Sequence, residues 1–224
     1  MRTLSPALAA VCALLTVASP ALGQRDAWQD KWYWGAQGGA FLYQTFDQTG
    51  ATSARQTAVG VGGHWLITKR RAALYFAYDQ LIFPAGTNSA VPNTASATGQ
   101  TPVSFSRGRR IQTSLYAIPS SRPLQVYAGF GFAIQHLSDV IPTAAFATAQ
   151  EQKIAEEQIG TWSTKAFAVM SGGFQLRFGR LALYGTYQYQ PSGSEFLLAT
   201  DQHLLSGGIR IALTHATEMI TTGQ

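Results

Sequence analysis

From residue 32 onward, apolar and polar positions alternate along most of the chain. The longest regular stretch is 124–137, where aliphatic and aromatic residues occupy every second position and Gln, Tyr, Gly and Ala stand between them. A period of two residues predicts β-strands, because successive side chains of a strand point to opposite faces. On this basis, strands are predicted at 32–46, 56–68, 72–83, 105–118, 124–137, 161–178, 181–190 and 201–213.

The connections between these strands alternate between tight turns and longer loops. Tight reversals are predicted at 69–71, 119–123 and 179–180, whereas 84–102, 138–160 and 191–200 are predicted loops, with a short helix expected within 147–158. Turns at one end and loops at the other are typical of bacterial outer-membrane barrels, and strands of this length can cross a bilayer. We therefore predict an all-β fold, an eight-stranded antiparallel transmembrane up-and-down β-barrel over residues 24–213, followed by a polar tail at 214–224.

The composition indicates which face of the strands points inward. Hydrophobic residues make up 46% of the chain and charged residues only 12%, against about 25% charged residues in a typical soluble domain. A soluble eight-stranded barrel would turn its apolar face inward and show charged side chains to water, which makes it the less favoured alternative. The polar face is instead expected to fill the lumen, with Gln37, His64, Asp79, Lys165, Gln175, Arg177 and Arg210 as its polar residues. Among these, Asp79, Lys165 and Arg177 are predicted to form ion pairs that stabilise the interior.

The first residues have the order of a secretory signal peptide. A short basic start is followed by an apolar run at 4–18 and by small residues up to Gly23. This pattern predicts cleavage after Gly23 and export to the outer membrane, since the apolar run is shorter than the roughly 20 residues that a spanning helix needs. Cys12, the one cysteine, lies in this leader, so the mature chain is expected to have neither disulfides nor a cysteine metal site.

The net charge of +5 does not indicate a nucleic-acid surface. The basic residues gather at predicted reversals, including Lys69–Arg71 and Arg107–Arg110, rather than on one helix or stripe, so no nucleic-acid partner is expected. At the rims of a barrel they would meet anionic headgroups, which makes outer-membrane lipid and lipopolysaccharide the expected partners. Aromatic residues near predicted strand ends are candidates for interfacial girdles: Trp32, Trp34, Trp65, Phe83, Tyr187 and Tyr189.

Two segments carry a resemblance to a known family. The run Val126–Phe132, and Ser171–Phe178 with the strand at 181–189 after it, combine alternating apolar residues with glycines. They resemble the superfamily of outer-membrane β-barrel domains that includes the membrane domain of outer membrane protein A. The resemblance covers nearly the whole mature chain and implies insertion by the barrel-assembly machinery. Members usually end on a terminal aromatic residue, whereas here the last predicted strand ends near Leu213 and a tail follows.

Candidate chemistry is confined to one segment. An eight-stranded barrel is filled by side chains and too narrow for a general porin. His136 and Ser138, with Glu151 further on, resemble the His-x-Ser pair and glutamate of lipid A deacylase barrels, and a nucleophilic serine needs such a base and orienting acid. Those enzymes carry the pair on the penultimate strand, where this chain has the sequence 187–191, with Tyr and Pro at the two positions. No cofactor is expected, and the four histidines lack metal-ligand spacing.

Three functions follow from this sequence. The favoured hypothesis is a non-enzymatic outer-membrane barrel with a structural role, or with a surface-interaction role through the loops at 84–102 and 138–160. The first alternative is a lipid A-modifying enzyme that uses His136 and Ser138. The second is a narrow passage for small apolar solutes, which requires a lateral gap in the barrel wall.

Overall fold

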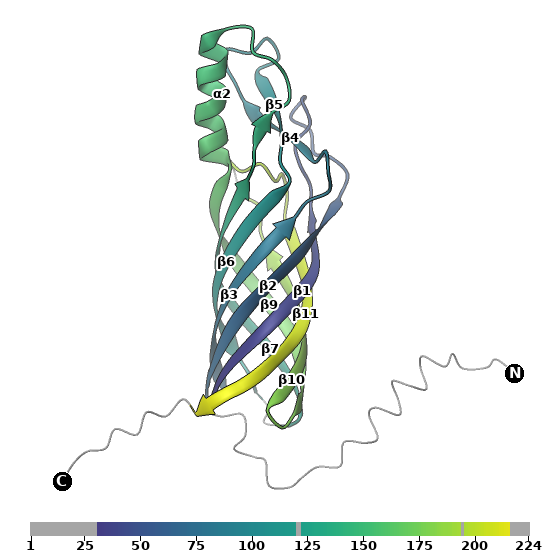
Figure 1. The fold of residues 1–224 in the computed structure, drawn as a ribbon, viewed down its shortest axis with the longest axis vertical. Helices are drawn as coiled ribbons and strands as arrows, with labels where there is room; N and C mark the ends of the chain where they lie inside the picture. The colour runs from purple at the N-terminus through teal and green to yellow at the C-terminus, as the bar shows by residue number, and fades with distance from the viewer. Residues whose placement is uncertain (1–30, 120–121, 194, 216–224) are drawn as a thin grey trace, which may run out of the picture.

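Eight strands form a closed antiparallel barrel with a separate three-stranded sheet beyond its mouth (Figure 1). The structure, a computed structural model, describes residues 31–119, 122–193 and 195–215. The barrel order is β1-β11-β10-β9-β7-β6-β3-β2, so barrel strands that follow one another in the chain are neighbours and β1 closes on β11. Closure gives every barrel strand a neighbour on each side. The predicted eight-stranded antiparallel barrel is therefore confirmed.

The barrel strands lie within three residues of their predicted bounds. They are β1 Lys31–Tyr43, β2 Gln56–Lys69, β3 Ala72–Ile82, β6 Arg107–Ala117, β7 Leu124–Ser138, β9 Thr164–Phe178, β10 Leu181–Gln190 and β11 Gln202–His215. β11 extends two residues beyond the predicted end at Leu213. The predicted signal peptide at 1–23 and the rest of the predicted tail, 216–224, lie outside the described residues.

The barrel strands turn most of their exposed apolar side chains to the outer surface, and polar side chains face inward in the middle of the barrel. On β6, Ile111 and Leu115 are more than half exposed, whereas Gln112 and Ser114, which lie between them in the sequence, are buried. This is the inverse of a soluble barrel, and a continuous apolar outer surface is stable only against hydrocarbon or another apolar partner. We call this outward surface the apolar belt. Its large members include Val61, Phe76, Ile111, Leu115, Val126, Phe130, Phe132, Ile134, Met170, Phe174, Leu183, Leu205 and Ile209.

The loops at one end form a structured cap. Strands β4 (Asn88–Pro92), β5 (Gln100–Ser104) and β8 (Ile141–Pro142) make the small sheet, and helix α2 (Ala149–Trp162) stands beside it beyond the barrel (Figure 1). The prediction of a plain loop at 84–102 was therefore wrong, because β4 and β5 are too short for their alternation to stand out. The predicted helix is confirmed, although it runs to Trp162. Thr148 caps it by accepting a hydrogen bond from the Glu151 amide.

Candidate functional site

A buried ion pair lies in the polar layer that crosses the lumen. Arg110 Nη1 lies 3.3 Å from Asp79 Oδ2, and both side chains are under 5% exposed. Gln37 donates to the other carboxylate oxygen of Asp79, and Arg110 Nη2 donates to Gln188 Oε1 at 2.7 Å. Both charges are therefore hydrogen-bonded beyond their mutual contact, which a buried pair requires.

A second arginine occupies the same layer without a carboxylate partner among the described residues. Arg210 Nε donates to His64 Nε2 at 2.9 Å, and Nη1 donates to Gln175 Oε1 at 2.9 Å. Its guanidinium lies 3.8 Å from the centroid of the Tyr184 ring, so a cation–π contact stabilises the charge.

A chain of hydrogen bonds joins the two arginines. Tyr184 Oη lies 3.3 Å from His64 Nδ1 and donates to Gln37 Oε1 at 2.8 Å. Gln37 in turn contacts Asp79, the partner of Arg110. The interior therefore contains one continuous polar network that extends from Arg210 to Arg110.

The structure brings five of the seven predicted lumen residues together: Gln37, His64, Asp79, Gln175 and Arg210. Lys165 and Arg177 lie apart from one another, near the two ends of β9, and both are partly exposed. The predicted pairing of Asp79 with Lys165 or Arg177 was wrong, because Asp79 pairs with Arg110.

Arg110 is a charged lumen residue that sequence analysis missed. The prediction included residues 107–110 in the strand at 105–118 but read their arginines as basic residues at a chain reversal; the segment opens strand β6. Arg110 lies on the same inward face of β6 as Gln112 and Ser114. Continuing the alternation of this strand two residues from Gln112 towards the strand's start would therefore have identified it.

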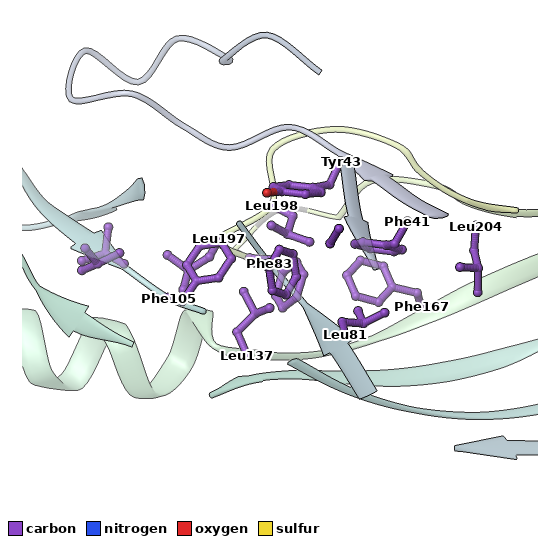
Figure 2. Close-up of a cluster of buried hydrophobic side chains, with 14 residues drawn as sticks. Phe41, Tyr43, Leu81, Phe83, Phe105, Leu137, Phe167, Leu197, Leu198 and Leu204 are labelled. Atoms are coloured by element: carbon purple, nitrogen blue, oxygen red, sulfur yellow. The ribbon is translucent and has the colours of Figure 1, made fainter. Parts of the chain in front are cut away.

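An apolar cluster closes the loop end of the lumen (Figure 2). The segment Phe196–Leu198, between β10 and β11, is under 2% exposed and packs among barrel side chains. Phe167 and Phe196 rings contact edge to face at 5.1 Å, and Leu197 N donates to Trp162 O at the end of α2. We call the whole cluster the loop-end plug: Phe41, Tyr43, Ala58, Leu81, Phe83, Val91, Val103, Phe105, Leu137, Phe167, Phe196, Leu197, Leu198 and Leu204.

Two sequence predictions change at this plug. Phe83 was expected in an interfacial girdle, but it is 4% exposed and its ring meets Phe105 inside the mouth at 4.9 Å. The segment 191–200 was expected to be a simple loop, yet its apolar residues fold inward to cover the opening. At the opposite end, a second buried cluster that includes Tyr33, Tyr75 and Tyr116 fills the lumen near the turns. Side chains therefore lie above and below the polar layer.

The candidate catalytic residues have separate local partners. His136 faces outward and its Nδ1 lies 2.7 Å from Thr164 Oγ1. Glu151 Oε2 accepts from Ala147 N at 2.8 Å at the start of α2, and Ser138 is the last residue of β7. No hydrogen bond among the described residues links His136, Ser138 and Glu151. Within the same part of the chain, no three His, Cys, Asp or Glu residues are placed to hold a metal ion.

Exposed aromatic residues lie near both ends of the outer surface. Trp32, Trp34 and Trp65 are exposed near the turn end, and Trp34 is the cross-strand neighbour of Trp65. Near the loop end, Tyr187 is exposed and its hydroxyl lies 2.7 Å from His203 Nδ1. Across the described ranges, no helix combines the length and apolar character needed to cross a bilayer.

Comparison with solved structures identifies the fold. Neisserial surface protein A is similar over 81% of this chain and 97% of its own, with a TM-score of 0.56 and 12% sequence identity. The chain has the fold of the small outer-membrane β-barrels. No family model and no curated protein matches its sequence.

Two further barrels of this kind, both from Pseudomonas aeruginosa, show lower structural similarity. The N-terminal barrel domain of OprF has a TM-score of 0.43 and 11% identity, covering 83% of this chain and 98% of that domain. The outer membrane protein OprG has a TM-score of 0.43 and 9% identity, covering 82% and 94%. At sequence identities this low, these two comparisons say nothing about the function of this chain.

Proposed function

We propose that this protein is a closed, non-conducting barrel of the outer membrane that presents its cap as an interaction surface outside the cell. The observation that carries the proposal is the loop-end plug, because it closes the lumen and joins the barrel to the cap. The proposed role is structural and non-enzymatic: His136 and Glu151 each have a separate local partner, and no hydrogen bond among the described residues joins either of them to Ser138.

The apolar belt supports a membrane location. Large apolar side chains cover the outer face of the barrel strands, with tryptophans at one end and a tyrosine at the other, as in barrels that sit between two lipid–water interfaces. Lys31 and His215, the outermost partners in the β1–β11 pairing, lie at the turn end. In outer-membrane barrels this end faces the periplasm, which would place the cap outside.

The wall beside β9 supports a closed barrel rather than a passage for apolar solutes. β10 pairs with β9 only up to Met170, so residues 164–169 of β9 have a barrel partner on one side, β7. The plug covers this place from within, since Phe167 is 5% exposed and Phe196 is fully buried. Gly193, in the connection that follows β10, lies against the Lys165 side chain.

Hydrogen bonds hold the elements of the cap together and attach the cap to the plug. An ordered surface of this kind favours a role in binding a partner. Asn93 Nδ2 donates to Thr101 Oγ1 at 2.8 Å and to Glu151 O at 2.9 Å, so it ties the small sheet to α2. Ser89 Oγ donates to Leu197 O at 2.7 Å and ties the sheet to the plug. Such contacts fix the cap relative to the barrel, which lowers the entropy cost of binding.

Single cysteines test the orientation, because Cys12 is the sole cysteine and lies in the predicted leader. Lys153→Cys on α2 should react with a membrane-impermeant maleimide on intact cells. The matched control is Arg71→Cys in the turn between β2 and β3, which should react only after the outer membrane is permeabilised. The opposite labelling pattern would contradict the proposal.

Conductance tests the closed lumen. The purified full chain, reconstituted in planar lipid bilayers, should show no unitary current steps at voltages where general porins conduct. Discrete and reproducible steps would show that the plug does not close the barrel.

A further inference from the structure

A row of polar side chains crosses the outward face of four neighbouring strands at the loop end. Hydrogen-bonded register places Gln80 of β3 beside Arg109 of β6, Arg109 beside His136 of β7, and His136 beside Thr164 of β9. We call these four residues the basic row. The next outward row towards the turn end is part of the apolar belt and consists of Tyr78, Ile111, Ile134 and Ala166. The basic row therefore marks the upper boundary of the apolar belt.

Arg109 is the free cation of this row. It is exposed on the outer face of β6 and forms no ion pair with any described residue. The arginines near it are already engaged: Arg107 pairs with Asp139 at 2.9 Å, and Arg110 is buried with Asp79 in the lumen. The guanidinium of Arg109 thus lies at the edge of the apolar belt, and no described residue provides a counterion for it.

His136 is held in place next to this guanidinium. Its Nδ1 lies 2.7 Å from Thr164 Oγ1 on the neighbouring strand, so one ring nitrogen is engaged and the ring orientation is fixed. The other ring nitrogen, Nε2, has no hydrogen-bond partner among the described residues and can contact a ligand. Arginine and a fixed imidazole on adjacent strands together provide several donors for one anionic group.

The surface directly below the row is apolar and uneven. On β9, the small side chains of Ala166 and Ala168 lie opposite Ile134 and Phe132 of β7, which are 53% and 68% exposed. β10 does not flank this part of β9, because its pairing begins at Met170. A shallow strip of methyl groups therefore runs beside two large side chains, and it is continuous with the basic row.

We propose that the basic row and this strip form a binding site for a phosphate-bearing membrane lipid. The headgroup phosphate is held by Arg109 and His136, and one acyl chain lies along Ala166 and Ala168. The planar donors of arginine match the geometry of phosphate, and the adjoining apolar strip fits an amphiphile better than a soluble anion. This inference rests on the proposed membrane location.

The test is native mass spectrometry of the purified full chain released from nanodiscs of phosphatidylcholine and phosphatidic acid. The wild-type protein should retain phosphatidic acid, and Arg109→Gln should weaken its affinity by about tenfold, since a charge-assisted hydrogen bond is lost. His136→Gln should weaken it less. The matched control is Arg55→Gln, which removes the same charge from an exposed position at the same end of the barrel and should leave affinity unchanged.

The results of this experiment distinguish a specific lipid site from unspecific attraction to anionic lipid and from a site for free phosphate. Equal retention by wild type and Arg109→Gln, or equal weakening by Arg55→Gln, would overturn the site, since either result means unspecific attraction to anionic lipid. Full displacement of phosphatidic acid by millimolar inorganic phosphate would show a free-anion site and overturn the lipid assignment. Heat-modifiable gel mobility of each nanodisc sample reports barrel insertion separately. A chain that fails to insert would contradict the proposed function, whereas an inserted chain without lipid selectivity contradicts only this inference.

Discussion

Asp79 and Arg110 are direct cross-strand neighbours on β3 and β6, and their buried side chains form an ion pair inside the barrel. Because their side chains point inward at paired positions, the contact exists only in the observed register of β3 against β6. A slip of one residue would turn one of the charges towards the membrane. The pair therefore favours one register in a wall whose outward side chains are almost uniformly apolar.

Breaking this pair should destabilise the barrel strongly. Asp79→Asn leaves the Arg110 charge buried without compensation, and we expect a loss of about 3–5 kcal/mol in the free energy of unfolding. The double variant Asp79→Leu with Arg110→Met removes both charges and should lose less than the single variant. Urea titration in lipid vesicles, followed by heat-modifiable mobility, measures both.

An exposed pair provides the matched control. Asp139→Asn breaks the contact with Arg107, whose side chain is 64% exposed, and should cost under about 1 kcal/mol. If Asp79→Asn were no more destabilising than Asp139→Asn, the buried pair would have no special role in stability.

The apolar belt makes a depth-dependent prediction. Phe130 lies near the middle of β7 on the outward face, and Leu124 is the first residue of the same strand. Phe130→Arg should cost about 2–4 kcal/mol in lipid vesicles, because the charge enters the centre of the hydrocarbon, whereas Leu124→Arg should cost about 0–1 kcal/mol near the interface. The same urea titration compares them, and equal costs would argue against a membrane-spanning belt.

The strands of the barrel wall could be predicted from the sequence, because a strand with one apolar and one polar face has apolar and polar residues at alternating positions. The inward position of Gln37 and the outward position of Ile111 both follow from this alternation. The ion-pair partner of Asp79 did not follow, since pairing depends on which strands are neighbours and on their register. Arg110 was grouped with Arg107 and Arg109 as basic residues at a chain reversal, and so it was not considered as a lumen residue.

The plug and the cap could not be predicted from local sequence patterns. Phe196–Leu198 is a short apolar run in a segment with Gly, Ser and Pro, and its inward path depends on contacts with Trp162 and Ser89, far away in the chain. The strands β4 and β5 have five residues each, so their alternation is too brief to separate them from loop. Tertiary contacts rather than local sequence determine both features.

Close approach of strands makes Gly129 sensitive to substitution. A Cβ at this position would lie 2.1 Å from Leu115 O and 2.2 Å from the Tyr116 ring on β6. Gly129→Ala should therefore destabilise the barrel by about 1–3 kcal/mol through overpacking. In the control Gly160→Ala, on α2, the new Cβ meets nothing within 4 Å, so stability should stay equal or rise by up to about 1 kcal/mol. A harmless Gly129→Ala, measured by thermal loss of the compact gel form, would contradict the packing described here.

The loop between β10 and β11 carries a carboxylate whose pKa should respond to one neighbour. The Tyr189 hydroxyl donates to Asp201 Oδ2 at 2.7 Å, and Ser192 N donates to Oδ1 at 2.8 Å. These bonds favour the charged form and hold the pKa of Asp201 below its ordinary value of 3.8, with the Tyr189 bond as the largest cause. Because the folded-state pKa is the lower one, the stabilisation is present above the unfolded-state pKa and is lost as pH falls through the folded-state pKa.

Tyr189→Phe should therefore raise the pKa of Asp201 towards its ordinary value. A carboxyl ¹³C NMR titration of the full chain in micelles measures this shift directly. The matched control is Tyr187→Phe, since the Tyr187 hydroxyl contacts His203 Nδ1 rather than the carboxylate, and it should move the Asp201 titration less. The same Asp201 pKa in wild type and in Tyr189→Phe would show that the tyrosine hydroxyl does not lower it.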